Sequence, residues 1–189
     1  MSQKNTLCLI GLGSNQPWGH FNSSDILVSS IYALCRVNIP VLRISRFYKT
    51  PCFPTGAGSD YVNATVMVSS QLDAPSLMEV LHFVEEEKDR QRPERWGKRT
   101  LDLDLLAYGN KVLPNFQVYD DWRRMSQDLQ MQIAPDRLIV PHPRLQDRAF
   151  VLGPLMDIAP DWRHPVLDKS VEQMFFSLEP RLRQELVSL

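Results

Sequence analysis

The residues of this chain best placed to do chemistry lie between positions 90 and 104. Two carboxylates, Asp102 and Asp104, are separated by one leucine, and apolar and polar residues alternate from Thr100 to Leu105 as in a half-buried β-strand. The carboxylates then share one strand face, with Cα atoms roughly 6–7 Å apart. Because like charges at that spacing repel, a divalent cation is expected between them, and magnesium suits a carboxylate pair that is completed by water and substrate phosphates.

A group of basic residues comes directly before this pair: Arg90, Arg92, Arg95, Lys98 and Arg99. Guanidinium groups bind phosphate oxygens in a bidentate manner, and a metal between carboxylates and phosphates neutralises the charge that develops in phosphoryl transfer. The stretch therefore predicts a magnesium–nucleoside triphosphate site. The alternative is a strand edge on which the aspartates pair with nearby arginines and bind nothing else.

Composition sets outer limits on the function. The chain has 189 residues and a net charge of −1, which is enough for one domain with a core and argues against a general nucleic-acid surface. Cys8, Cys35 and Cys52 are odd in number and widely spaced, which fits neither a disulfide framework nor a zinc site. No basic-then-apolar leader and no apolar run of roughly 18 residues is present. We expect a reduced, cytoplasmic protein without a membrane segment.

Hydrophobic periodicity predicts the elements that position the candidate site. Strands are expected at about 7–10, 41–48, 60–69 and 100–108, with helices from Ser23 or Ser24 to Arg36 and from Asp73 onward. This order gives the fold class α+β, with a ferredoxin-like β-α-β-β-α-β core, a four-stranded antiparallel sheet and two helices on one face. The glycine-containing segment 11–15 is interpreted as a structural turn after the first strand.

The predicted strand 60–69 has a polar face. Tyr61, Asn63 and Thr65 alternate with an apolar set on the other face, namely Val62, Ala64, Val66 and Val68. Tyr61 and Asn63 could hold a planar heterocycle by ring stacking and amide hydrogen bonds. The alternative is an ordinary solvated strand face.

Two further segments lie outside this core. Residues 111–138 form a long connection, and its middle, Asp120–Gln132, has near-helical apolar spacing. The tail 168–189 is predicted to be helical with a break at Pro180, which adds C-terminal helices to the core.

Several groups of residues, taken together and in this order, resemble the 6-hydroxymethyl-7,8-dihydropterin pyrophosphokinase family of folate biosynthesis. They are Gly13-Ser14-Asn15, Tyr48-x-Thr50-Pro51, Asp60-Tyr61-x-Asn63-Ala64, Arg90-x-Arg92-x-x-Arg95-Trp96-Gly97-x-Arg99-Thr100-Leu101-Asp102-Leu103-Asp104, Pro141-His142-Pro143-Arg144 and Arg148-x-Phe150-Val151-Leu152. The resemblance covers about residues 6–162. It implies a single domain over 1–189, with an insertion at about 111–138 and a helical tail at 168–189.

The resemblance also implies an activity. The family transfers the β,γ-diphosphate of ATP to the hydroxymethyl group of the reduced pterin and releases AMP. By similarity, Asp102 and Asp104 would bind two Mg²⁺ ions and would act in catalysis together with Arg90, Arg92 and Arg99. The implied partners are ATP and the pterin, with no nucleic acid and no membrane, and the expected state is a monomer or a weak homodimer.

The same resemblance implies two sets of substrate contacts. The ATP-binding residues would be His82, Glu85, Arg90, Arg92, Trp96, Arg99, His142 and Arg148. The pterin-binding residues would be Thr50, Pro51, Phe53, Tyr61, Asn63, Trp96 and Phe150, with Tyr61 and Phe150 on either side of the ring.

The sequence departs from the family pattern where a loop must close. Asp89 stands in place of the usual glycine, Lys98 in place of the usual proline, and Cys52-Phe53-Pro54 in place of a more usual Pro-x-Gly. The changes at Asp89 and Lys98 bear on loop closure more than on the chemistry, and the change at 52–54 is expected to stiffen the pterin-side loop.

A second hypothesis treats the sheet as an RNA-recognition surface, with Tyr61 and Trp96 as stacking platforms. The aromatic RNP signature of such surfaces is missing, and Asp102 and Asp104 would repel phosphates there.

Overall fold

The computed structural model describes residues 5–52, 58–88 and 100–189. Its core elements are β1 (Thr6–Ser14), α1 (Ser23–Arg36), β2 (Val41–Ile44), β3 (Tyr48–Thr50), β4 (Tyr61–Ser70), α2 (Ala74–Glu86) and β5 (Asp102–Tyr108). After them come α3 (Phe116–Arg124), α4 (Gln127–Gln132), the 3₁₀ turn η1 (Leu145–Asp147), α5 (Ala149–Ile158), α6 (Val171–Ser177), α7 (Pro180–Gln184) and β6 (Val187–Ser188).

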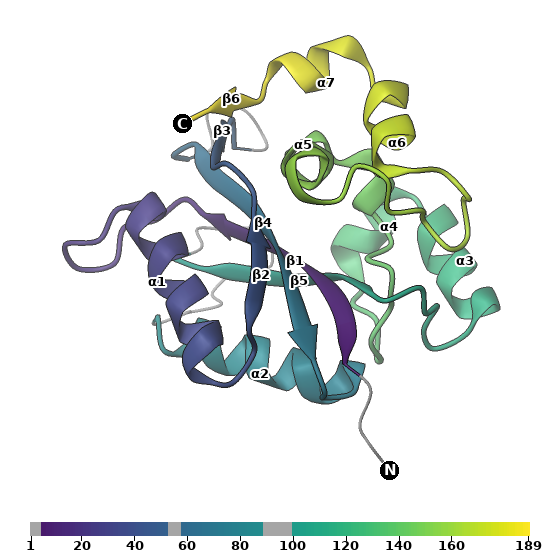
Figure 1. Ribbon diagram of the computed structural model, residues 1–189. Coiled ribbons are helices and arrows are strands. Elements are labelled where there is room, and N and C mark those ends of the chain that lie inside the picture. Colours follow the sequence, from purple (N-terminus) through teal and green to yellow (C-terminus); the bar gives the residue numbers. More distant parts are fainter. Residues whose placement is uncertain (1–4, 53–57, 89–99) are drawn as a thin grey trace.

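The strands form one antiparallel sheet in the order β5-β1-β4-β3-β6, and β2 also pairs with β4 (Figure 1). Apart from β6, this is the ferredoxin-like order, with β2 and β3 sharing the position of a single strand. The predicted fold class is therefore confirmed. The predicted count of four strands is wrong for the described residues, because 41–48 is not one strand and the tail adds β6.

Ser45 explains why β2 and β3 are separate. Its N–H donates to the carbonyl of Thr65, but the Thr65 N–H donates to the Ser45 hydroxyl at 2.9 Å instead of to a backbone carbonyl. A side chain thus replaces one backbone acceptor, and the regular ladder is interrupted there.

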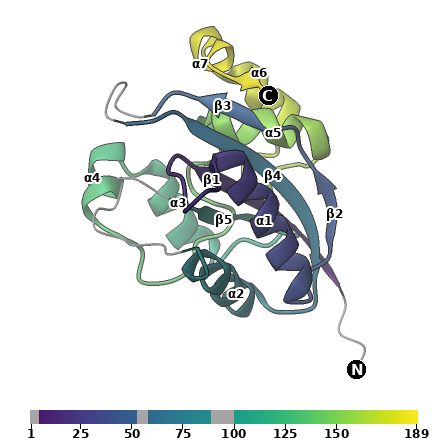
Figure 2. The same cartoon turned by 90° about the vertical axis from the view of Figure 1, so that its left-hand side faces the viewer.

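The sheet is covered on both faces (Figures 1 and 2). One face packs on α1 and α2 through a large apolar cluster that contains the alternate leucines Leu101, Leu103 and Leu105. On the other face α5 and α6 pack over Leu9, Leu106 and Ala107. The predicted pair of helices on one face, α1 and α2, is confirmed. The sequence did not predict which face the later helices cover; the apolar α5 packs on the opposite face together with α6.

The helix starts follow from capping residues. Asn22, one position before the expected serines, caps α1: its side chain accepts from the Asp25 N–H, and the Asp25 carboxylate accepts from the Asn22 N–H. Asp73 caps α2 by accepting from the Ser76 N–H, as the sequence predicts.

Strand β1 continues through the segment that the sequence predicts to be a turn. Gly11 lies between Thr65 of β4 and Asp104 of β5, and Gly13 lies between Asn63 and Asp102. The turn prediction is wrong because both glycines are strand residues with partners on both sides. Since Ile10 and Leu12 enter the core with α1 and α2, the two glycines face the opposite side, together with the carboxylates.

The insertion contacts the segment that precedes α6. The predicted helix at 120–132 is two helices, α3 and α4, and the buried Tyr119 hydroxyl lies 2.9 Å from Nε2 of His164, which precedes α6. The tail is helical with a break before Pro180, as predicted, but it ends in a strand. Within the described parts of the chain, no helix combines the length and apolar character needed to cross a bilayer.

Candidate active site

Three side chains from two strands converge over Gly13. A methyl group added at Gly13 would lie 3.3 Å from Oδ1 of Asn63, 3.9 Å from Cβ of Asp102 and 3.9 Å from a ring carbon of Tyr61. The aromatic ring, the amide and the first carboxylate therefore surround one patch of bare backbone. Gly11 pairs with Asp104 of β5, and the buried side chain of Leu106 covers it. The sequence prediction that these residues share one polar face is confirmed.

The amide of Asn63 is held in a defined orientation. Its Nδ2 donates to the hydroxyl of Thr50 at 2.8 Å, and both residues are buried. Because the nitrogen is engaged with β3, the oxygen is the atom that lies over Gly13. Thr50 is also the register partner of Tyr61, so β3 sits directly beside the proposed ring platform, and Pro51 follows at the surface.

Glu85 supports the carboxylate pair from the helix side. It lies near the end of α2, is 1% exposed, and its Oε1 accepts from the backbone N–H of Leu103 at 2.7 Å. Leu103 separates Asp102 from Asp104, and both aspartates are partly exposed. The Glu85 contact thus fixes the backbone from which both carboxylates project.

The donor set fits magnesium. Among residues 5–52, 58–88 and 100–189, no group of three or more His, Cys, Asp or Glu side chains could hold a metal ion unaided. A carboxylate pair of this kind suits an ion that takes its remaining ligands from water and phosphate oxygens.

His142 lies next to this pair as a neutral hydrogen-bond donor. Burial lowers the pKa of His142 to about 3, the positive charge of Arg148 lowers it further, and Asp102 acts in the opposite direction. Nδ1 accepts from the Arg144 N–H at 3.1 Å, so the ring proton is on Nε2. The His142 N–H donates to the carbonyl of Leu106 and so anchors the loop to β5.

Helix α5 begins with two more candidate residues. Arg148 is its N-cap residue, and the guanidinium carbon lies 5.5 Å from the centre of the Phe150 ring. Phe150 is 39% exposed, and α5 packs on β4, the strand of Tyr61. The structure therefore brings a cation and an aromatic ring from α5 to the same face of the sheet as the β4 residues.

For the remaining predicted residues, the structure gives a position on α2 or no position. His82 lies on α2, one helical turn before Glu85, and is partly exposed. Five predicted residues fall outside the described part of the chain: Phe53, Arg90, Arg92, Trp96 and Arg99.

Gly13 and Arg144 were not among the predicted residues. The signal for Gly13 was present in the repeated glycines of β1, which leave open backbone where a side chain would project. Arg144 makes the backbone contact to His142 and an ion pair with Asp147 at 3.1 Å.

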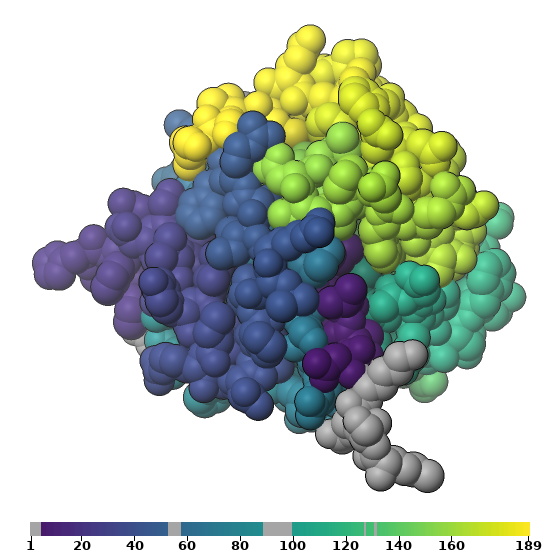
Figure 3. All heavy atoms as spheres, in the orientation of Figure 1, coloured from purple at the N-terminus to yellow at the C-terminus, as the bar shows by residue number. Residues whose placement is uncertain are grey.

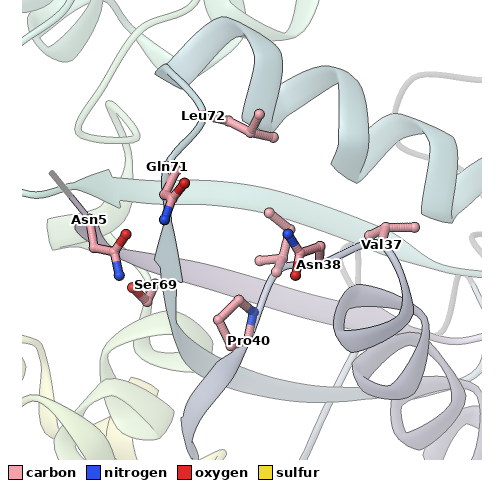
Figure 4. Close-up of a pocket in the computed structure, with 8 residues that line it drawn as sticks. Asn5, Val37, Asn38, Pro40, Ser69, Gln71 and Leu72 are labelled. Atoms are coloured by element: carbon pink, nitrogen blue, oxygen red, sulfur yellow. The ribbon is translucent and has the colours of Figure 1, made fainter. Parts of the chain in front are cut away.

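A separate pocket of about 250 Å³ lies at the other end of β1 and β4, where residues 5, 37–40, 69, 71 and 72 line it (Figure 4). Among the described residues, its lining contains amides, a serine and apolar groups and no ionisable side chain. Such a lining does not suit phosphate chemistry, and the site with the carboxylates remains the candidate.

Comparison with known proteins identifies a matching family. Residues 9–160 match the model of the family described as 7,8-dihydro-6-hydroxymethylpterin-pyrophosphokinase. The chain is 36% identical over 151 residues to a 2-amino-4-hydroxy-6-hydroxymethyldihydropteridine pyrophosphokinase of Synechocystis sp., which covers 79% of this chain and 67% of the relative. A protein of the same name from Haemophilus influenzae is 35% identical over 124 residues, covering 66% and 65%.

Among solved structures, the wild-type HPPK-DHPS of Plasmodium falciparum matches with a TM-score of 0.65 and 14% identity, over 92% of this chain and 45% of that one. This likeness supports the fold. The chain spans about two thirds of the length of the two relatives and less than half of the Plasmodium chain.

Proposed function

This chain belongs to the 7,8-dihydro-6-hydroxymethylpterin-pyrophosphokinase family, and from that premise we propose that it transfers the β,γ-diphosphate group of ATP to the hydroxymethyl group of 6-hydroxymethyl-7,8-dihydropterin, with AMP as the second product. The observation that carries the proposal is the convergence of Tyr61, Asn63 and Asp102 over Gly13. A flat ring held by the first two residues has its substituent beside a carboxylate that can bind the metal of a metal–nucleotide complex.

The pterin is assigned to the region beside Gly13, where β4, β3 and α5 come together. Tyr61 and Phe150 supply the two ring faces, and stacking is worth about 0.5–1.5 kcal/mol per aromatic pair beyond burial. The Asn63 oxygen, fixed by Thr50, accepts from N–H groups at the pterin edge. Pro51 and Phe53 belong to the same loop and are assigned to this side.

The nucleotide is assigned to the side of β5, α2 and the 142–148 loop. Asp102 and Asp104 would hold two Mg²⁺ ions, which on binding neutralise the phosphates and activate the attacking and leaving oxygens. His142 donates from Nε2 without carrying a charge, and Arg148 supplies a permanent cation beside it. His82 and Glu85 approach from α2, and the family pattern adds Arg90, Arg92, Trp96 and Arg99.

The chain's own groups mainly position the reactants. Attack on the β-phosphorus requires the acceptor oxygen, the phosphorus and the leaving oxygen to be in line. The bare backbone at Gly13 leaves space for this arrangement, and the strands that carry its polar groups are held by the sheet. No dedicated side-chain nucleophile is required.

We also propose that residues 1–189 form one domain with a core of about 6–162. The Tyr119–His164 contact and the pairing of β6 with β3 tie the insertion and tail to that core. A monomer or weak homodimer is expected, and light scattering over a range of protein concentrations measures this.

The test of the activity is the identity of the nucleotide product. Purified protein is incubated with ATP, magnesium and the reduced pterin alcohol, and nucleotides are separated by chromatography. AMP and pterin diphosphate are expected in equal amounts, and a reduced pterin with a 6-methyl group in place of the alcohol should give none. Formation of ADP alone, or RNA binding without magnesium and no turnover, contradicts the proposal.

A further inference from the structure

The last residues of the chain form β6, a strand added to the sheet beside β3. β6 pairs with β3, with Val187 opposite Lys49 and Ser188 opposite Tyr48, and the Leu189 N–H donates to the carbonyl of Phe47 at 2.9 Å. The segment after α6 runs over the top of the molecule, through α7, to reach this edge (Figures 1 and 3). It lies beyond residue 160, where the family match ends.

Just before β6, Leu186 packs so closely against α5 that a side chain at Gly153 would displace it. A Cβ placed on Gly153 would lie 2.5 Å from Cδ1 of Leu186 and 3.6 Å from both its Cγ and Cδ2. Gly153 is buried within α5. Leu186 thus fills the space that the missing side chain of Gly153 leaves.

The two elements that this segment contacts are the two sides of the proposed pterin pocket. β3 carries Thr50, which orients Asn63, and α5 carries Phe150 one turn before Gly153. A second tie joins α5 to the start of β3: the Asp157 carboxylate accepts from the Arg46 N–H at 3.0 Å and from the Tyr48 hydroxyl at 3.0 Å. Leu186 and β6 supply a link nearer to the pocket.

We infer that Leu186 is a positioning residue. It holds α5, which carries Phe150, at a fixed distance from β3, whose Thr50 is the register partner of Tyr61, and so sets the width of the pterin slot between the Phe150 and Tyr61 rings. The inference rests on the proposed function. A flat ring stacked on both faces tolerates little change in this width, because a misplacement on the order of 1 Å can reduce rates by about a hundredfold. The proposed ATP contacts on β5 and α2 do not involve the segment 185–189.

Four full-length variants test the inference. Leu186→Ala empties the contact, and Gly153→Ala forces Leu186 away; in the double variant the new methyl group occupies space that the leucine has left. Leu189→Ala is the matched control, because its side chain is 62% exposed and its backbone bond to Phe47 is kept. Alanine also favours a helix over glycine by about 1 kcal/mol, so Gly153→Ala should not unwind α5 by itself.

The expected result is a selective increase in the KM for the pterin. In each of the two single variants at positions 186 and 153, the KM for the pterin should rise on the order of tenfold, with a much smaller change in the KM for ATP. The double variant should return toward the parent value, and Leu189→Ala should match it. Equal increases in both KM values, or a lower melting temperature with unchanged KM values, would overturn the inference.

A second measurement separates this inference from the proposed function. Amide hydrogen exchange in the ligand-free protein should become faster at residues 48–50 and 149–153 in Leu186→Ala, and stay unchanged in α2 and β5. If the parent protein does not turn over the pterin, the proposed function fails, and the exchange data still judge the positioning role. Exchange at residues 48–50 that is the same in Leu186→Ala and Leu189→Ala would refute it.

Discussion

At the scale of single residues, the candidate site combines two carboxylates with a short stretch of backbone that carries no side chain. Asp102 and Asp104 project from backbone that Glu85 holds at Leu103, and Asp102 lies beside the bare backbone of Gly13. Removal of one carboxylate should therefore change the chemistry and leave the shape of the ring pocket in place.

Asp102→Ala and Asp104→Ala should each reduce turnover by about a thousandfold or more, since metal-mediated charge stabilisation contributes several kcal/mol. Pterin affinity should be largely kept, because the stacking and amide groups remain. Steady-state AMP release and calorimetric pterin binding measure the two effects. Near-parental turnover in either variant would remove the metal assignment.

Gly13→Ala addresses the open floor. The added methyl group meets Asn63 Oδ1 at 3.3 Å and its other neighbours at 3.9 Å, so the fold should accept it with a small shift. It would occupy the space that we assign to the pterin, and the pterin KM should rise on the order of tenfold, as expected for one misplaced contact surface.

Gly11→Ala is the comparison for this prediction. Its methyl group would meet the flexible end of Leu106 at 3.4 Å, away from Tyr61 and Asn63. A pterin KM that rises equally in both variants would show that the effect is a general one on β1 and does not arise from the floor beneath the ring.

At the scale of elements, α2 holds β5 through one buried hydrogen bond. Glu85→Ala leaves the Leu103 N–H without this acceptor, and the free energy of unfolding should fall by about 1–3 kcal/mol. Glu85→Gln keeps a side-chain oxygen at the same place, and its free energy of unfolding should fall by less. Urea denaturation of both variants measures the difference, and an equal loss in the two would argue that the carboxylate charge matters more than the Leu103 bond.

The elements also show which features the sequence can predict. The faces of β4 and β5 follow from strict alternation, because leucine and valine positions bury one side and leave the polar residues on the other. The end of β1 could not be read in this way, since glycines carry no side chain to show a period. The division at Ser45 depends on a hydroxyl that accepts from Thr65, twenty residues away in the chain.

The same limit applies to the tail. Its apolar spacing predicts helix, but residues 187–189 become extended because β3 offers an unpaired edge, and an edge made by distant residues leaves no local signal. Family motifs predict Tyr61, Asn63 and the aspartates as site residues, and the structure brings Tyr61, Asn63 and Asp102 together. The repeated glycines of β1 are a weak signal for Gly13, whereas the role proposed for Leu186 depends on three-dimensional neighbours that the pattern does not show.

At the scale of the whole molecule, the insertion and the segment before α6 meet at a buried histidine. His164 has no exposed surface; its Nδ1 accepts from the N–H groups of Val166 and Leu167 at 3.2 Å each, and Nε2 faces Tyr119. Burial lowers the pKa of His164 to about 4, and the charge of Arg123 lowers it further. A proton on Nδ1 would break the two backbone contacts.

This arrangement predicts a loss of stability in mild acid. An unfolded histidine titrates near pH 6.5, so between pH 6.5 and 4 the unfolded chain binds more protons than the folded one, and the free energy of unfolding falls as the pH falls. The contribution of His164 to the free energy of unfolding is complete above pH 6.5. About 2 kcal/mol of this contribution should be lost between pH 7 and pH 5. His142, whose pKa is also lowered, acts in the same direction.

The variant His164→Gln separates the contribution of His164 to the pH dependence from that of His142. Urea denaturation at pH 7 and pH 5 gives the loss for the parent protein and for His164→Gln, which has no group that titrates in this range. The variant should be less stable at pH 7, because it loses the backbone contacts, yet its stability should change less between the two pH values.

Hydrogen bonds with arginines are the main cause of the lowered pKa values of Asp120 and Asp168. Protonation of these two carboxylates lowers the free energy of unfolding only at pH values below the usual titration range of aspartate. They therefore do not act in the window from pH 5 to 7. If His164→Gln loses as much stability in that window as the parent, the acid sensitivity belongs to another group and the insertion is not held by a neutral histidine.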